Sequence, residues 1–206
     1  MIPEQLMMLT DLWVLKFNDN KLSGTIPSYL EAFNSLQVLR LRHNSISGTL
    51  PTNIGALENL QVLQLDNNGI EGSLPSELGG LNATLTHLWL NENSLTGTVP
   101  SEIATLTLLS ELKLNGNNFE GSIPSLFGRL SSLTRLWLSD NDLVGAVSTE
   151  IGNLTLLDEL YLHDNDDLTG LLPIELCKVP LTSNVSIDCE SSLKCANCSR
   201  NICYCD

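Results

Sequence analysis

The sequence predicts an α/β repeat solenoid whose turns stack into one parallel β-sheet. Two observations predict it: a leucine pattern that returns about every 24 residues along the 206-residue chain, and a column of asparagines that returns with it. A repeat of this length cannot bury its apolar residues alone, so neighbouring turns must stack into a continuous core. The asparagines of the column are Asn20, Asn44, Asn68, Asn93, Asn117, Asn141 and Asn165.

Each repeat contains a short strand. In residues 36–41, Leu39 and Leu41 alternate with Arg40, which is the period-two pattern of a half-buried strand. The leucines are therefore expected to point inward and Arg40 outward. The same spacing predicts seven strands, which begin near Val14, Val38, Val62, His87, Glu111, Arg135 and Glu159.

The second half of each repeat turns away from the strand. The side-chain amide of Asn44 can pair with backbone groups that this bend leaves unpaired. Gly48 permits a backbone conformation closed to other residues, and Pro51 favours an extended stretch. The glycine column is Gly24, Gly48, Gly72, Gly97, Gly121, Gly145 and Gly170, and the proline column is Pro27, Pro51, Pro75, Pro100, Pro124 and Pro173, with Ser148 in the gap.

Composition limits the partners of this chain. The formal net charge is −14, from 24 acidic and 10 basic residues. Nucleic-acid binding needs basic surface to neutralise phosphates, so we expect no nucleic-acid partner. No apolar run approaches the 18 or more residues of a membrane span, and no glycine-rich loop indicates a nucleotide cofactor. The sequence therefore predicts neither a membrane span nor a cofactor in this chain.

The amino terminus has the pattern of a partial repeat. Residues 1–6 align with residues 25–30, so we expect the chain to begin in the last third of an earlier turn. The sequence shows no signal peptide and no amino-terminal cysteine cap. A first turn without a cap is expected to expose its leucines.

All six cysteines lie where the repeats stop, which divides the chain into a solenoid at 1–176 and a cysteine-rich cap at 177–206. An even count in a short segment favours three disulfides of open connectivity and an oxidising compartment. The alternative is a zinc site, although the second cysteine pair is closer together than zinc ligands usually are. The cysteines are Cys177, Cys189, Cys195, Cys198, Cys203 and Cys205.

Four sequons for N-glycosylation are present, at Asn82, Asn153, Asn184 and Asn197. The abundance of Asn, Ser and Thr would produce about this many by chance. We expect none of them to lie in a strand segment, and Asn82 and Asn153 to fall on the turn region opposite the sheet.

The half-repeat Leu-Ser-Gly-Thr-Ile-Pro at residues 22–27 resembles the plant-type leucine-rich repeats of receptor-like kinase ectodomains, receptor-like proteins and polygalacturonase-inhibiting proteins. The resemblance covers residues 2–176. It implies a curved, right-handed, twisted superhelix with a concave parallel sheet, and binding of peptides, proteins or glycans outside the cell. The cysteine tail is similar to the tails of secreted repeat proteins from microalgae such as diatoms.

Candidate ligand-binding residues are those at outward strand positions of the concave face. The tryptophans Trp13, Trp89 and Trp137 all fall there, and the most central outward column reads Lys16, Arg40, Gln64, Trp89, Lys113, Trp137 and Tyr161. We expect its last four members to form a contiguous exposed strip, in which Trp137→Ala costs the fold little. Two interpretations stay open: a ligand platform, because Trp, Tyr and Arg dominate binding hot spots and aromatic faces stack on sugars, or side chains that only cover the sheet. The binding candidates are Lys16, Arg40, Arg42, Trp89, Lys113, Arg135, Trp137 and Tyr161.

Catalysis has little support in the sequence. The three histidines are whole turns apart, and the adjacent His163 and Asp164 are more typical of a solvated loop than of a triad. Five aspartates can gather near the carboxyl end, either as a solvated edge or as a calcium site; they are Asp140, Asp142, Asp164, Asp166 and Asp167. The calcium-loop pattern of a helix pair is absent, so we predict no metal site.

The leading hypothesis is a non-enzymatic extracellular recognition module, receptor-like or secreted at the cell surface, that binds a protein, peptide or glycan on its concave face. The alternatives are an adhesive extracellular-matrix protein, an inhibitor of a secreted hydrolase, and an intracellular scaffold with reduced cysteines. The oligomeric state stays open.

Overall fold

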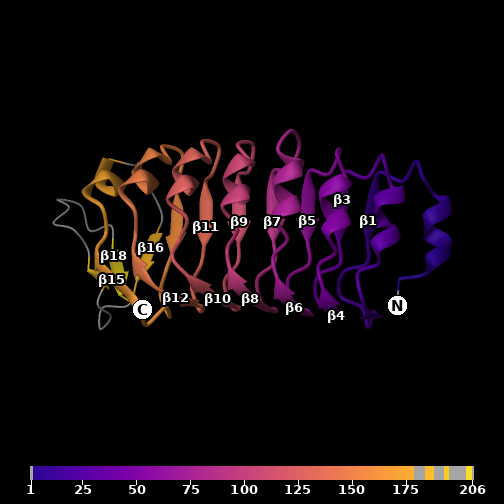
Figure 1. Ribbon diagram of the computed structural model, residues 1–206, viewed down its shortest axis with the longest axis horizontal. Helices are drawn as coiled ribbons and strands as arrows, with labels where there is room; N and C mark the ends of the chain where they lie inside the picture. The colour runs from indigo at the N-terminus through magenta and orange to yellow at the C-terminus, as the bar shows by residue number, and fades with distance from the viewer. Residues whose placement is uncertain (1, 179–183, 188–192, 195–202, 206) are drawn as a thin grey trace.

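The computed structural model describes residues 2–178, 184–187, 193–194 and 203–205, with side chains through Leu176 except that of Met7. The turns stack in chain order along one axis, from the N-terminal end to the C-terminal end (Figure 1). Each turn contributes a strand, a short extended segment and a 3-10 helix.

The strands form one nine-stranded parallel sheet in the order β1-β3-β5-β7-β9-β11-β14-β16-β18. The first seven begin at the residues that the spacing predicts. They are β1 (Val14–Lys16), β3 (Val38–Arg40), β5 (Val62–Gln64), β7 (His87–Trp89), β9 (Glu111–Lys113), β11 (Arg135–Trp137) and β14 (Glu159–Tyr161). We call the solvent-facing side of this sheet, predicted above to be the concave surface, the strand face.

The inward strand positions build the core. Leu39 and Leu41 are fully buried, whereas Arg40 between them is half-buried. The inward leucines of all seven strands join one continuous hydrophobic cluster. Burial of a leucine side chain contributes roughly 1.5–3 kcal/mol, so stacking of turns supplies the main stabilisation of the fold.

A second parallel sheet runs beside the first, and the sequence analysis did not predict it. It has six strands in the order β12-β10-β8-β6-β4-β2. The signal was present: in residues 46–50, Ile46 and Leu50 are buried while Ser47 and Thr49 are exposed. The strands are β2 (Ser23–Gly24), β4 (Ser45–Thr49), β6 (Gly69–Ser73), β8 (Ser94–Thr98), β10 (Asn118–Gly121) and β12 (Asp142–Leu143).

A row of 3-10 helices completes each turn. The residues that precede η2 to η7 are the proline column and Ser148, all with extended backbone, such as Pro51 at φ −72° and ψ 142°. The helices are η1 (Glu4–Met8), η2 (Ser28–Ala32), η3 (Thr52–Ala56), η4 (Ser76–Leu81), η5 (Ser101–Thr105), η6 (Ser125–Arg129), η7 (Thr149–Asn153) and η8 (Ile174–Lys178).

The asparagine column links neighbouring turns. Asn44 Nδ2 donates to the carbonyls of Phe17 and Leu41, and its Oδ1 accepts from the amide of Leu22, each at 2.9 Å. The amide therefore satisfies backbone groups of its own turn and of the preceding one, as predicted. Asn68, Asn93, Asn117, Asn141 and Asn165 repeat this set of bonds.

The glycine column has positive φ at all seven positions, as predicted. At Gly48 (φ +74°) an added Cβ would lie 2.8 Å from Thr25 Cγ2, so the threonine of one turn covers the glycine of the next. The residue before each column asparagine also has positive φ, which was not predicted. These residues are Asp19, His43, Asn67, Glu92, Gly116, Asp140 and Asp164.

The main sheet continues past residue 176. Strand β16 (Asn184–Ile187) pairs with β14, and β18 (Cys203–Cys205) pairs with β16, both in parallel. A third, three-stranded sheet joins β13 (Gly145–Ala146), β15 (Leu168–Leu171) and β17 (Leu193–Lys194). A separate cap at 177–206 stays a prediction, because no cysteine side chain lies within the described part of the chain.

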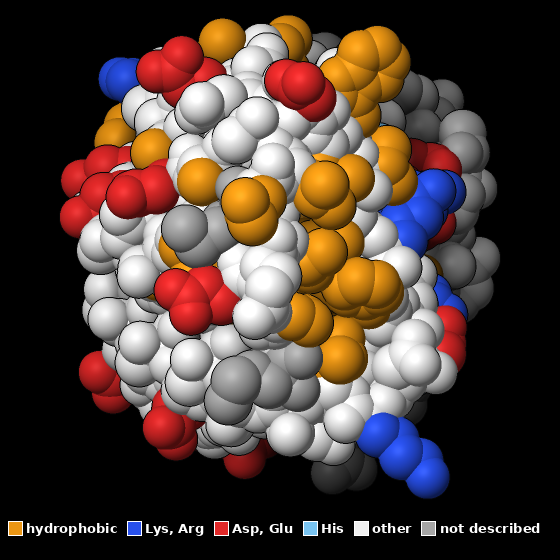
Figure 2. Space-filling model, turned by 90° about the vertical axis from the view of Figure 1, so that its right-hand side faces the viewer, with side chains coloured by type: hydrophobic (Ala, Val, Ile, Leu, Met, Phe, Trp, Pro, Cys, Tyr) orange, Lys and Arg blue, Asp and Glu red, His pale blue; other side chains and the backbone are white. Residues whose placement is uncertain are grey.

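The first turn exposes apolar side chains at the N-terminal end, as the sequence predicts. Met8, Leu9 and Trp13 are 80%, 51% and 64% exposed. Figure 2 looks at this end, where hydrophobic side chains gather. Most of the basic side chains visible there lie along one edge of the view. No helix among the described residues has the length and apolarity to span a membrane.

Candidate functional site

The strand face aligns the predicted central column in one row. Strand pairing places each member beside the next, which confirms the register read from the sequence. The row is Lys16, Arg40, Gln64, Trp89, Lys113, Trp137 and Tyr161.

Lys113 lies between two tryptophan rings in this row. Its Nζ is 4.1 Å from the ring centroid of Trp89 and 3.7 Å from that of Trp137, both cation–π distances. The rings cover the lysine so fully that it is 9% exposed. Burial lowers the pKa of Lys113 below its ordinary value, against the charge of Glu111, which raises it.

The aromatic rings stack along the row. Trp137 and Tyr161 lie with centroids 5.1 Å apart and planes 25° apart, close to the strand spacing of about 4.8 Å. Since Trp137 has Lys113 over one ring and Tyr161 stacked on it as well, its faces are occupied within the protein. Trp137 therefore turns a ring edge, rather than a ring face, toward solvent.

Beside the row, acids and bases alternate on neighbouring strands. Arg135 donates from Nη1 to Glu111 Oε1 at 2.5 Å and from Nε to Glu159 Oε1 at 3.2 Å. Trp137 Nε1 donates to Glu159 Oε2 at 2.9 Å, which fixes the indole. Hydrogen bonding with Glu159, followed by the charge of Glu111, raises the pKa of Arg135. Lys113 Nζ lies 3.6 Å from Glu111 Oε2. Two cations and two anions are thus paired.

We call the group formed by His87, Trp89, Glu111, Lys113, Arg135, Trp137, Glu159 and Tyr161 the closed half of the strand face. The expectation of a contiguous row is met, but the expectation of an exposed strip is wrong for Lys113. Sequence reasoning also missed Glu111. Its signal was the in-register alternation Glu111, Arg135, Glu159, since opposite charges on adjacent strands pair.

The other end of the strand face is open. Lys16 is exposed and pairs in register with Arg40, and Arg42 follows two residues later on the same side. Among the described residues, Asp19 is the acid within ion-pair distance of this group, 4.0 Å from Arg42 Nη2. The Nε atoms of Arg40 and Arg42 are buried without a hydrogen-bond partner. We call Lys16, Arg40 and Arg42 the open half.

The predicted aspartates do come together near the carboxyl end. Asp140, Asp142, Asp164, Asp166 and Asp167 line a cavity of about 360 Å³ with Asn141. In the described part of the chain, no three His, Cys, Asp or Glu side chains are arranged to hold a metal ion. His163 Nε2 lies 3.9 Å from Asp164 Oδ2 at this edge.

The modification candidates fall in different regions. Asn153 ends the 3-10 helix η7, Asn82 follows η4, and both side chains are exposed. The expectation that no sequon lies in a strand is wrong for Asn184, because the sheet continues past the last predicted strand and Asn184 begins β16; its side chain is outside the described part. Asn197 and the side chains of all six cysteines lie outside it too.

The fold and the strand face define a repeat protein whose outward strand positions are free to vary over a constant core. The pattern described as Leucine Rich Repeat matches residues 35–57, 59–81, 84–106, 108–130 and 132–154. The chain belongs to the leucine-rich repeat family. None of the curated proteins compared with it matches.

Solved structures share this fold. The ectodomain of the Arabidopsis thaliana receptor kinase GASSHO1/SCHENGEN3, in complex with CASPARIAN STRIP INTEGRITY FACTOR 2, is 39% identical with a TM-score of 0.84 over 95% of this chain and 24% of that one. The Arabidopsis receptor kinase HAESA, in complex with the peptide hormone IDA and the co-receptor SERK1, is 32% identical with a TM-score of 0.87 over 94% of this chain and 32% of that one. The chain thus spans about a quarter to a third of these receptor chains.

A plant ice-binding protein has the same fold, with 26% identity and a TM-score of 0.70 over 100% of this chain and 71% of that one. Proteins with different ligands therefore share this solenoid. Function has to be argued from the surface of this chain rather than from the fold.

Proposed function

We propose that this chain is a non-enzymatic extracellular recognition module of the receptor-like type, which binds a peptide or protein segment along the strand face. The observation that carries the proposal is the open half: the cations Lys16, Arg40 and Arg42 stand together on a chain of net charge −14. The proposal is supported by the two similar receptor kinases described above. The structure of GASSHO1/SCHENGEN3 is a complex with CASPARIAN STRIP INTEGRITY FACTOR 2, and that of HAESA is a complex with the peptide hormone IDA.

The open half suits an acidic group of the ligand. Guanidinium groups bind carboxylates through paired, charge-assisted hydrogen bonds. Arg40 and Arg42 point to the same side from adjacent outward positions, and each has an Nε without a partner. A buried donor without a partner costs free energy, so an acidic ligand group that lets these side chains reorient toward it gains affinity.

The closed half favours a peptide over a glycan. Sugar rings bind aromatic residues through the ring faces, and here Lys113 and Tyr161 already occupy the faces of Trp137. The closed half instead offers a rigid wall of ring edges and aliphatic carbon. A peptide side chain can pack on such a wall while its acidic group lies at the open half.

The extracellular location is part of the proposal. A cysteine-rich tail with disulfides and glycosylated sequons would place the chain outside the cell. An adhesive matrix protein and an inhibitor of a secreted hydrolase are the alternatives on the same strand face. Both would bind a larger partner than a peptide.

The test uses a panel of synthetic peptides with an acidic group and matched neutral versions. We expect acidic members to bind in fluorescence anisotropy, and the variant with Arg40→Gln and Arg42→Gln to bind them at least about tenfold more weakly. Arg129→Gln removes one cation away from the strand face and should leave binding unchanged. Equal binding of acidic and neutral members would contradict the assignment of the open half.

A second candidate is binding of an ice surface, as for the plant protein that matches the whole chain. The observation in its favour is a row of exposed hydroxyls along the second sheet. They come from Thr49, Ser73 and Thr98, which lie in its strands, and from Thr25 and Ser122, which directly follow β2 and β10. Ice recrystallisation in the presence of the protein tests it, with Thr98→Lys as the disrupting variant.

A further inference from the structure

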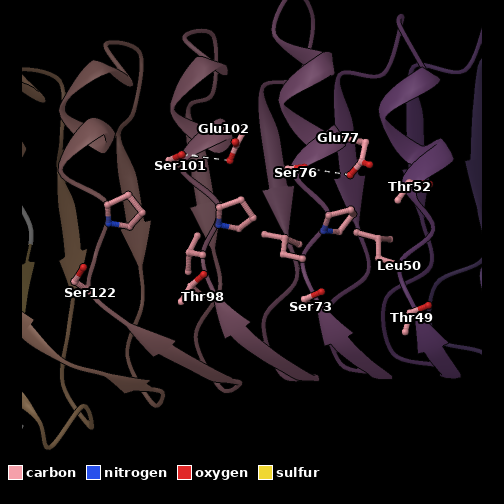
Figure 3. Close-up of a pocket in the computed structure, with 15 residues that line it drawn as sticks. Thr49, Leu50, Thr52, Ser73, Ser76, Glu77, Thr98, Ser101, Glu102 and Ser122 are labelled. Atoms are coloured by element: carbon pink, nitrogen blue, oxygen red, sulfur yellow. Dashed lines mark hydrogen bonds between the residues drawn. The ribbon is translucent and has the colours of Figure 1, made fainter.

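A long groove lies on the flank of the solenoid, away from the strand face. It runs between the second sheet and the 3-10 helices and has a volume of about 900 Å³. Figure 3 shows its lining repeated from turn to turn, so that the groove crosses the strands rather than following one. At about 4.8 Å per turn, the four turns that line it give a length of about 15 Å.

The groove has an apolar floor and hydroxyl walls. Leu50, Leu74 and Val99 form the floor and are at most 5% exposed. The wall residues are Thr49, Ser73, Thr98 and Ser122 on the sheet side, and Thr52, Ser76 and Ser101 on the helix side. Pro75, Pro100 and Pro124 complete the lining, so the groove is uncharged apart from the carboxylates of Glu77 and Glu102.

Hydrogen bonding makes this lining rich in acceptors. Ser76 Oγ donates to Glu77 Oε2 at 3.4 Å, and Ser101 Oγ donates to Glu102 Oε2 at 3.3 Å (Figure 3). These hydroxyls use their only proton on the carboxylates, so lone pairs remain for a ligand. No lysine, arginine, histidine or side-chain amide is among the lining residues. The other wall hydroxyls can donate as well as accept, but the two carboxylates only accept, so a cationic donor is the ligand group that this lining matches.

The charged residues that line the groove have one sign, because they are Glu77 and Glu102. Of the seven basic side chains in the described part, Lys16, Arg40, Arg42, Lys113 and Arg135 are on the strand face, which leaves Lys21 and Arg129 elsewhere. The exposed acids Glu71 and Glu120 stand on the second sheet, in strands β6 and β10. With a net charge of −14, the field over this flank attracts cations.

We propose that the flank groove docks an extended, basic segment of a partner protein, at a site separate from the strand face. Lysine or arginine side chains of the segment pair with Glu77 and Glu102, and its backbone amides donate to the wall hydroxyls. Aliphatic parts of the segment cover the floor. A groove of about 15 Å holds four to five extended residues at about 3.3 Å each.

The probe is an alternating lysine–serine decapeptide, titrated into the full chain at low and at physiological salt. We expect binding that weakens with salt, and a loss of affinity of about fivefold in the variant with Glu77→Gln and Glu102→Gln, since each exposed ion pair contributes little. The charge-matched control carries Asp11→Asn and Glu58→Gln, two exposed acids that do not line the groove. It should change affinity less than about twofold.

Substitutions at Thr98 test the position inside the groove. Thr98→Lys should weaken binding and Thr98→Glu should strengthen it, because the side chain is exposed on the wall. An equal loss in the control variant would mean diffuse attraction to an acidic protein and would overturn the proposal. Binding of an alternating aspartate–serine peptide would also overturn the proposal. A third contrary outcome is that the basic peptide does not bind, whereas the protein changes ice growth and Thr98→Lys abolishes that change. The strand-face variant with Arg40→Gln and Arg42→Gln should bind the basic probe as the unmodified chain does.

Discussion

The closed and open halves of the strand face share a backbone but differ in how their side chains are satisfied. Both are built on parallel strands in the same register, with leucines beneath them. In the closed half, Lys113 and Arg135 have acidic partners, and Lys113 also has aromatic cover. In the open half, the Nε atoms of Arg40 and Arg42 find no hydrogen-bond partner among the described residues. The indole Nε1 of Trp89 in the closed half is left in the same way, so the two halves differ in their ion pairs rather than at every donor.

This difference assigns the two halves of one surface to different tasks: the closed half stabilises the fold, and the open half is where we expect a ligand to bind. Side chains that satisfy one another across strands add stability to the turns and hold a fixed shape. Side chains with unused hydrogen-bonding capacity add little stability, yet they are where a ligand can replace water with better partners. We expect substitutions in the closed half to change folding and those in the open half to change binding.

The largest effect is expected for Glu111→Ala. Glu111 is 8% exposed and is within ion-pair distance of Lys113 and Arg135, so its loss leaves a covered lysine without its ion-pair partner and with only the weaker attraction of Glu159. Removal of one partner from a buried pair is strongly destabilising, and we expect a loss of about 3 kcal/mol in the free energy of unfolding, measured by urea titration.

Asp19→Asn is the matched change in the open half. Asp19 is exposed and lies 4.0 Å from Arg42, so the expected loss is below about 0.5 kcal/mol. Similar losses for Glu111→Ala and Asp19→Asn would show that the two halves do not differ in the way proposed.

A second, smaller effect is expected for Trp137→Ala. From sequence this residue reads as an exposed anchor that costs the fold little, but it covers Lys113, stacks on Tyr161 and donates to Glu159. We expect a loss of about 2 kcal/mol, below that of a fully buried tryptophan because the ring is partly exposed. Trp13→Ala, at 64% exposure, should cost less than about 0.5 kcal/mol in the same titration.

The sequence was sufficient for what the repeat imposes on every turn. Strand starts such as Val38, the positive φ of Gly48 and the inward amide of Asn44 follow from local chemistry that recurs seven times. Because the same residue types recur at the same spacing in seven repeats, the start of each strand can be assigned where a single repeat would not suffice. The second sheet was missed because Ile46, Ser47 and Thr49 fall in the half-repeat that was interpreted as a turn away from the first strand, so their alternation was not taken as a strand signal.

The candidate site was less accessible to sequence reasoning. Spacing placed Trp89, Lys113 and Trp137 side by side, because register is set by the repeat. It did not show that the lysine lies between the rings, since that depends on side-chain rotamers and on competition between water and ring faces for the ammonium. The positions were predictable, whereas the exposure was not.

The smallest effect concerns pH and Lys113. Its pKa in the folded chain is lowered by burial, so between that lowered value and the ordinary value of about 10.4 the unfolded chain binds more protons than the folded one. The contribution of Lys113 to the free energy of unfolding should therefore rise as pH rises from neutral through this window, because the folded chain loses the proton of a covered charge.

The comparison is with Lys113→Met, which keeps an unbranched chain between the rings but does not titrate. Tyr29, whose pKa is raised by burial and then by Glu4, has the opposite influence at alkaline pH, but it is present in both proteins and cancels. We expect the difference in free energy of unfolding, native chain minus variant, to increase from pH 7 to pH 10. A difference that is flat with pH, or that falls, would mean that the lysine is solvated in solution and that the closed half is more open than its contacts indicate.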